Sequence, residues 1–181
     1  MQATDLTSSY FELFGLPVCF DIDTRALAER YRELQRVVHP DRFATAADAE
    51  RRLSMQLATR VNEGFRTLKD PLARARYLLE LKGVALDDAD TRLDGGFLMQ
   101  QMELRERMDA VKGSADAGQR LHELHGDIRQ LERQLVDELA TLFADGSPQA
   151  LRQARDASRK LQFFHRLGEE LAQLDDELAG S

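Results

Sequence analysis

The sequence predicts an all-α protein built from two helical domains. Leucine, alanine, glutamate and arginine dominate its 181 residues, whereas glycine and proline number only 11 and 4, a mixture that favours helices over strands. Apolar residues recur every three or four positions through most of the chain, as the buried face of a helix requires. We find no strand-like alternation of apolar and polar residues.

Helix-capping signals place the first two helices. Ser9 and Glu12 have the spacing of a capping box, so a short helix should begin there and stop at Gly15. Asp23 should cap a second helix. Pro40 ends that helix, because the residue before a proline is disfavoured in the α conformation. The apolar residues of the second helix recur at helical spacing and are Leu27, Tyr31, Leu34 and Val38.

A longer third helix and a fourth helix complete the first domain. The third helix should pack antiparallel against the second, which makes residues 39–46 the tip of a helical hairpin. Asp70 and Pro71 begin the fourth helix as its N-cap and first residue. This domain should span residues 1–82, with a linker at 83–94. The apolar stripe expected on the third helix is Leu53, Leu57, Val61, Phe65 and Leu68.

The second domain, residues 95–181, should be an antiparallel three-helix bundle. Amphipathic segments are expected at about 95–112, 115–144 and 147–178, separated by breaks that contain glycine and serine. The apolar residues of the middle segment lie close to heptad spacing. Short turns between such long segments imply neighbouring antiparallel helices.

Charge is divided unevenly between the two halves. Residues 1–82 carry 13 lysines and arginines against 12 acidic residues, whereas residues 83–181 carry 12 against 20. A nucleic-acid-binding protein is usually far more basic, so the asymmetry indicates two halves with different partners. One cysteine excludes an intramolecular disulfide framework. No membrane-length apolar run and no secretory signal are seen, which predicts a soluble cytoplasmic protein.

The tripeptide His39-Pro40-Asp41 lies at the expected hairpin tip, between a basic amphipathic helix and a long helix. This arrangement resembles the J-domain of co-chaperones that serve DnaK-type heat-shock ATPases. The resemblance implies that the His-Pro-Asp loop contacts the ATPase and its interdomain linker. An exposed carboxylate on a proline-stiffened loop suits that role, because it can pair with a partner arginine at little ordering cost. The basic residues expected to dock on an acidic surface of the ATPase are Arg30, Arg32, Arg36 and Arg42.

Two other interpretations of the tripeptide remain open. In one it is only a turn, and in the other His39 is a general base that Asp41 orients. We find no nucleophile motif, glycine-rich phosphate loop or metal triad to complete an active site. The sequence therefore predicts a protein that is not an enzyme and that needs no cofactor or metal.

The helical segment near residues 97–111 has two apolar faces. At about 100° per residue, Phe97 and Leu104 share one face with other core-type residues. A helix in a three-helix bundle buries one stripe, not two opposite ones. The second face should therefore either pack on the first domain or form an adaptable client-binding patch. Phe163 can extend that patch, because its neighbour Phe164 lies on the core stripe of the last helix.

Several longer sequence segments indicate a more specific family within the J-domain co-chaperones. They lie at residues 10–17, 70–79, 97–99 and 102–106. With an N-terminal J-domain and an acidic helical C-terminal domain, they resemble the HscB-type iron–sulfur cluster assembly co-chaperones over nearly the whole chain. The resemblance implies that the C-terminal domain binds an IscU-type scaffold protein and delivers it to an HscA-type ATPase. The scaffold-binding positions that it implies are Leu98, Met99, Met102, Glu103, Glu106 and Phe163.

The sequence thus predicts a monomeric co-chaperone that promotes iron–sulfur cluster assembly and transfer. It should stimulate the HscA/DnaK-type ATPase through the His-Pro-Asp loop and bind the scaffold through the C-terminal domain. We expect no nucleic-acid or membrane partner. Two alternatives remain, namely a J-domain co-chaperone for a different client and a helical adaptor with no chaperone link.

Overall fold

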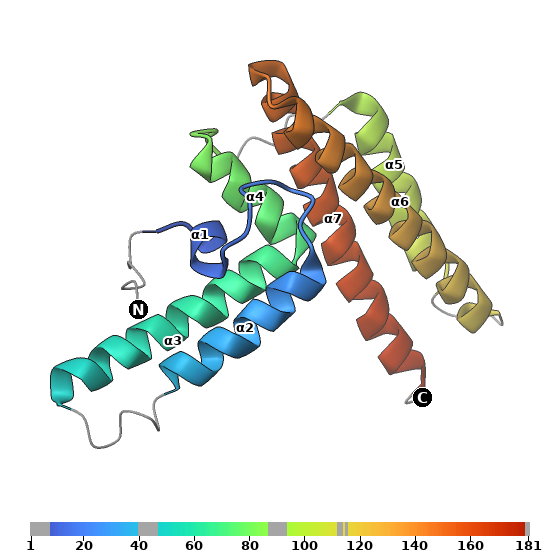
Figure 1. Cartoon of the computed structure of the whole chain (residues 1–181). Helices are drawn as coiled ribbons and strands as arrows, with labels where there is room; N and C mark the ends of the chain where they lie inside the picture. The colour runs from blue at the N-terminus through green and yellow to red at the C-terminus, as the bar shows by residue number, and fades with distance from the viewer. Residues whose placement is uncertain (1–7, 40–46, 87–93, 112–113, 115, 180–181) are drawn as a thin grey trace. The chain divides into compact units, whose positions relative to one another are not determined.

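The computed structural model describes residues 8–39, 47–86, 94–111, 114 and 116–179 (Figure 1). Within these ranges every regular element is an α-helix and no strand occurs. The chain divides into two compact units, Met1–Lys82 and Gly83–Ser181. The predicted all-α fold, a helical hairpin with short flanking helices followed by a three-helix unit, is confirmed.

The N-terminal unit is built on an antiparallel helical hairpin. Its helices are α1 (Tyr10–Phe14), α2 (Thr24–Val38), α3 (Asp48–Lys69) and α4 (Pro71–Leu81), and α2 lies alongside α3 (Figure 1). The predicted capping box is present, since the Ser9 hydroxyl accepts from the Glu12 N–H at 3.2 Å and the Ser9 N–H donates to the Glu12 carboxylate at 2.7 Å. The Asp23 carboxylate likewise accepts from the first N–H groups of α2.

Close approach of α1 to α3 depends on a glycine. A Cβ placed on Gly64 would lie 2.8 Å from Tyr10 Cδ1 and 3.0 Å from Phe14 Cε2. Tyr10 is itself held by Tyr77, whose hydroxyl accepts from the Tyr10 N–H at 2.9 Å and whose ring centroid is 4.8 Å away. The aromatic side chains of α1 therefore rest directly on the backbone of α3.

The apolar stripe predicted for α3 is wrong at its first position. Leu53 is 47% exposed, and Ser54 is buried in its place. The Ser54 hydroxyl donates to the Val38 carbonyl at 2.8 Å. This carbonyl lies in the last turn of α2, where no intrahelical partner is available. Satisfying it favours the rotation of α3 that turns Leu53 outward.

The C-terminal unit consists of α5 (Gly95–Asp109), α6 (Ala117–Asp145) and α7 (Pro148–Ala179). Helices α6 and α7 run antiparallel along much of their length, with α5 against them (Figure 1). Gly146, at φ +65°, ends α6 in the left-handed conformation that glycine tolerates. The Ser147 hydroxyl then caps α7 by accepting from the Ala150 N–H at 3.2 Å.

Candidate protein-interaction surfaces

The first candidate surface begins at the end of α2. The helix stops where the backbone of His39 turns extended, at φ −60° and ψ 126°, as expected for a residue before proline. The His39 side chain is exposed. The other predicted contact residues of the loop, Pro40, Asp41 and Arg42, lie outside the described residues.

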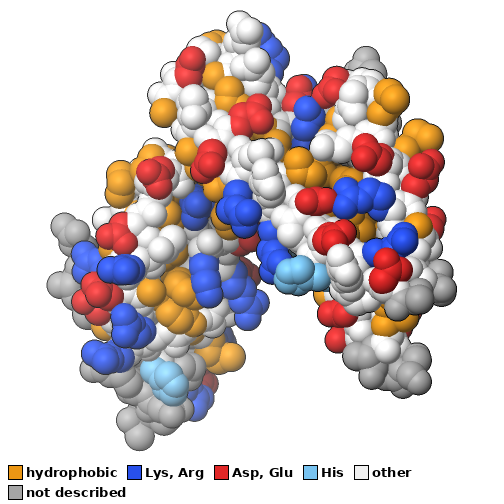
Figure 2. All heavy atoms as spheres, turned by 90° about the vertical axis from the view of Figure 1, so that its right-hand side faces the viewer, with side chains coloured by type: hydrophobic (Ala, Val, Ile, Leu, Met, Phe, Trp, Pro, Cys, Tyr) orange, Lys and Arg blue, Asp and Glu red, His pale blue; other side chains and the backbone are white. Residues whose placement is uncertain are grey.

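The predicted arginines of α2 do not share one face. Arg32 and Arg36 lie one turn apart, whereas Arg30 projects about 160° away from Arg32 and pairs with Glu33 at 2.9 Å. Arg25 joins Arg32 and Arg36 on their exposed face, although it was not among the predicted contacts. Its seven-residue spacing from Arg32 was the signal that could have identified it. Lysine and arginine side chains gather over this unit (lower left in Figure 2).

Apolar side chains are exposed near the same end of the hairpin. Val37, Leu53 and Met55 keep 45%, 47% and 60% of their surface exposed. The hydrogen bond between Ser54 and Val38 holds this part of α3 beside the end of α2. The chain that carries His39 is therefore bordered by apolar as well as basic groups.

The second candidate surface is built on α5. The helix begins at Asp94, whose carboxylate accepts from the Phe97 N–H at 2.8 Å. Phe97 and Leu104 are buried, as the sequence predicts for that face. Because these two residues fix the rotation of α5, they also determine which residues the opposite face presents.

The opposite face of α5 is apolar and open. Leu98, Met99 and Met102 keep 46%, 74% and 63% of their surface exposed, and Glu103 and Glu106 are exposed beside them. Flexible methionine and leucine side chains adapt to a partner at small cost. Neighbouring apolar side chains on one helix face are a feature of protein-binding surfaces.

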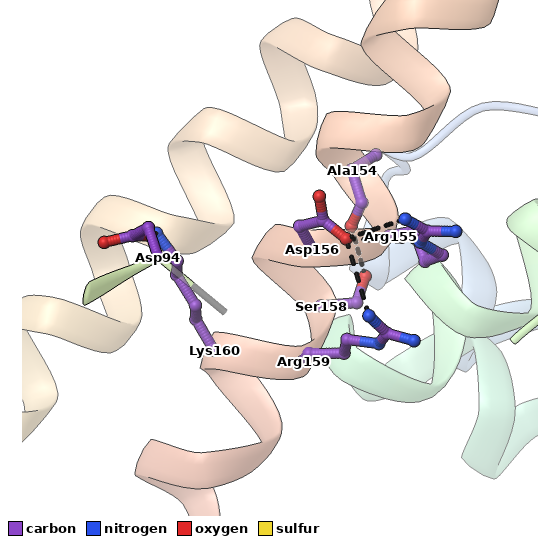
Figure 3. Close-up of polar contacts among 7 residues, drawn as sticks. All are labelled: Asp94, Ala154, Arg155, Asp156, Ser158, Arg159 and Lys160. Atoms are coloured by element: carbon purple, nitrogen blue, oxygen red, sulfur yellow. Dashed lines mark hydrogen bonds and ion pairs between the residues drawn. The ribbon is translucent and has the colours of Figure 1, made fainter. Parts of the chain in front are cut away.

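Ion pairs fasten both ends of α5. The Lys160 ammonium of α7 lies 2.8 Å from the Asp94 carboxylate (Figure 3) and 5.4 Å from the centre of the Phe97 ring. Near the other end, Arg107 lies 2.6 Å from Asp127 of α6. The hydrogen bond from Lys160 and, second, that from the Phe97 N–H lower the pKa of Asp94. The Asp94 carboxyl group is therefore ionised at neutral pH.

Phe163 is half-buried at one edge of α5. Its ring makes edge contacts with Phe97 and Phe164, at centroid separations of 5.6 and 5.5 Å. The Arg105 guanidinium lies 5.9 Å from the same ring and pairs with Glu170 at 3.6 Å. Phe163 is thus fixed by neighbouring aromatic rings, with an arginine over it.

A cavity of about 830 Å³ opens beside α5 and is lined by residues of α5, α6 and α7. Leu131 and Leu135 of α6 line it, together with Phe97 and Phe164. Four of the predicted scaffold contacts also line it, namely Met99, Met102, Glu103 and Glu106. Leu98 and Phe163 do not. The cavity therefore includes four of the six predicted contacts, whereas Leu98 of α5 and Phe163 of α7 lie outside it.

Both surfaces are suited to contacts with proteins. Among the residues with described positions, no group of three or more histidine, cysteine, aspartate or glutamate side chains is placed to hold a metal ion. In that same part of the chain, no helix is both long and apolar enough to cross a membrane. One surface offers positive charge, and the other offers adaptable apolar side chains beside carboxylates.

Comparisons with a family model, a known relative and solved structures all match HscB co-chaperones. A family model described as the HSCB C-terminal oligomerisation domain matches residues 93–172. The co-chaperone protein HscB homolog of Shewanella baltica (strain OS195) is 45% identical over 171 residues, covering 94% of this chain and 98% of the relative. The solved chaperone HscB from Vibrio cholerae is 38% identical with a TM-score of 0.85, covering 94% and 99% of the two chains. Human co-chaperone protein HscB is 29% identical with a TM-score of 0.87, covering 97% and 86%.

Proposed function

Because the chain belongs to the HscB family of co-chaperones, we propose that it links an IscU-type iron–sulfur scaffold to an HscA/DnaK-type ATPase. The J-domain stimulates ATP hydrolysis by the chaperone, and the C-terminal domain presents the scaffold. The protein makes and breaks no covalent bond of its own. It acts by binding one state of the chaperone more tightly than another, which shifts the population toward that state.

The observation that carries the scaffold assignment is the open apolar face of α5. Leu98, Met99 and Met102 are exposed there, although the opposite face of the same helix is buried. Burying these apolar side chains against a partner removes them from water, which stabilises the complex. Glu103 and Glu106 at the margin orient the partner and exclude uncharged or acidic competitors.

The J-domain meets the ATPase through the end of α2. His39-Pro40-Asp41 supplies the stimulating contact, and Arg42 lies beside it in the sequence. Arg32 and Arg36 form an exposed basic stripe that leads to it. Exposed charges of this kind raise the association rate and set the orientation of docking more than they raise affinity.

Steady-state ATPase rates of an HscA-type chaperone test both assignments. Scaffold and this protein are added singly and together, beside a His39→Gln variant and a Met99→Ala/Met102→Ala double variant. We expect synergistic stimulation by the wild type and none by His39→Gln. The double variant should keep its own stimulation but lose the synergy with scaffold.

The outcomes separate the two halves of the proposal. Stimulation without any effect of scaffold would retain the J-domain role and remove the iron–sulfur client, leaving a co-chaperone for a different client. No stimulation of this or any DnaK-type ATPase would overturn the chaperone role itself.

A further inference from the structure

The cavity beside α5 has a second wall that the predicted scaffold contacts do not include. Leu131, Gln134 and Glu138 of α6 line it together with Met99 and Met102 of α5. Gln134 and Glu138 are exposed, and Leu131 is half-buried. The wall is therefore open to a partner seated on α5.

We infer that this α6 wall is part of the scaffold-binding site, and that it receives a segment with an apolar side chain flanked by lysine or arginine. The inference rests on the proposed function, because it extends the surface assigned to the scaffold. It adds a second helix to that surface and states the chemistry of the segment bound.

Continuity of the surface is the first argument. Met99, Met102 and Glu106 line the cavity together with the α6 residues. A partner that covers these side chains of α5 therefore also covers the mouth of the cavity. If the bound partner left the cavity empty, the atoms that line it would lack van der Waals contacts. A partner side chain inserted into the cavity would supply those contacts.

The shape and lining of the cavity are the second argument. Its floor is apolar, because Leu135, Phe97 and Phe164 are buried at 8%, 4% and 2% exposure. Its volume of about 830 Å³ lies in the range of about 300–1,000 Å³ of small-molecule pockets, so a large side chain of a partner has room to enter it. A large apolar side chain is the group that such a floor binds best.

Charge at the cavity is the third argument, and it selects the partner. Glu103 and Glu106 of α5 and Glu138 of α6 all line the cavity and are exposed. The cation among the described lining residues is Lys160, which Asp94 already holds at 2.8 Å. The remaining field is negative, so it attracts lysine or arginine and repels an acidic segment.

Two exposed positions on α6 allow a test that leaves the fold intact. Glu138→Lys reverses a rim charge, and Gln134→Lys adds one. Asp137→Lys is the matched control, because Asp137 is an exposed acid of the same helix that does not line the cavity. Titration calorimetry with an IscU-type scaffold measures the Kd for the full-length wild type, each variant and Met99→Ala.

The expected result is a Kd raised about fivefold to tenfold by Glu138→Lys and Gln134→Lys, with less than about a twofold change for Asp137→Lys. Raising the salt concentration from about 0.05 to 0.5 M should weaken wild-type binding more than binding by Glu138→Lys.

Each contrary outcome has its own meaning. If Met99→Ala weakens binding while both α6 variants bind as the wild type does, the inference fails and the proposed function stands. If the wild type itself does not bind the scaffold, both are overturned. If the α6 variants weaken binding with unchanged salt dependence, the cationic partner is ruled out.

Discussion

Replacing Gly64 by alanine should destabilise the J-domain, although alanine is the better helix former. The new Cβ would lie 2.8 Å from Tyr10 Cδ1 and 3.0 Å from Phe14 Cε2. Neither ring moves easily, because Phe14 is 1% exposed and Tyr10 is pinned between Tyr77 at 4.8 Å and the Arg60 guanidinium at 5.2 Å. The substitution therefore forces α1 away from α3.

The magnitude follows from two opposing terms. Alanine gains about 1 kcal/mol over glycine in a helix interior, whereas overpacking a buried site costs about 1–3 kcal/mol. We expect a net loss of about 1 kcal/mol in the free energy of unfolding. With a slope of about 1–2 kcal/mol per molar urea, the unfolding midpoint should fall by about 0.5–1 M.

Tyrosine fluorescence isolates this effect. The chain has three tyrosines and no tryptophan, and Tyr10, Tyr31 and Tyr77 all belong to the N-terminal unit. The matched control is Gly126→Ala in α6, where a Cβ would meet nothing within 4 Å. This control should leave the fluorescence transition unchanged and raise the stability of the C-terminal domain, measured by circular dichroism. A Gly64→Ala midpoint equal to or above that of the wild type would refute the packing argument.

Four further predictions follow from the same contacts. Arg32→Glu should lower the rate of association with the ATPase chaperone several-fold at low salt. Arg30→Glu should lower that rate less, since Arg30 projects from another side of α2 and pairs with Glu33. Equal effects of the two variants in stopped-flow binding would contradict this placement. Ser54→Ala should lower the urea midpoint of tyrosine fluorescence by removing about 1 kcal/mol, because the Val38 carbonyl loses its buried donor; an unchanged midpoint would mean that the bond is of no consequence. The lowered pKa of Asp94 means that its ion pair holds at neutral pH. The pair is lost as the pH falls through that lowered pKa, below the ordinary value of about 3.9. Lys160→Met should raise the pKa read from the Asp94 carboxyl carbon by NMR, and identical titrations in the two proteins would remove Lys160 as the cause. Phe163→Ala should weaken scaffold binding and also lower the melting temperature of the C-terminal domain, because Phe163 supports Phe97 and Phe164 by edge contacts; a melting temperature equal to that of the wild type would show that the ring is not structural.

Local signals in the sequence were sufficient for the helices and for the two-faced character of α5. The capping residues Ser9, Asp23 and Asp70 act on N–H groups within three positions, so their effect is readable without the fold. Helical geometry alone placed Met99 and Met102 on the face that the bundle does not bury, but it left two alternatives for that face, packing on the first domain or exposure to a client.

What the sequence could not supply depends on residues far apart in the chain. The partner of Ser54 is a carbonyl of another helix, so the periodicity of α3 alone misplaced Leu53. The pairing of Lys160 with Asp94 joins two helices, and the cavity that takes Met99 but not Leu98 exists only once α6 lies beside α5. The roles of Pro40, Asp41 and Arg42 stay predictions, since these residues lie outside those described.

The modest burial of α5 has a thermodynamic consequence for binding. This helix buries Phe97 and Leu104, whereas α6 buries Leu121, Leu124, Ile128, Leu135 and Leu139. Because the free energy of local opening rises with the apolar surface that the opening exposes, α5 detaches at lower cost than the α6–α7 pair unfolds. The observed dissociation constant is the intrinsic value divided by the fraction of molecules in which α5 is docked. Under the proposed function, temperature and mutations that weaken the docking of α5 therefore change scaffold affinity without altering a contact residue.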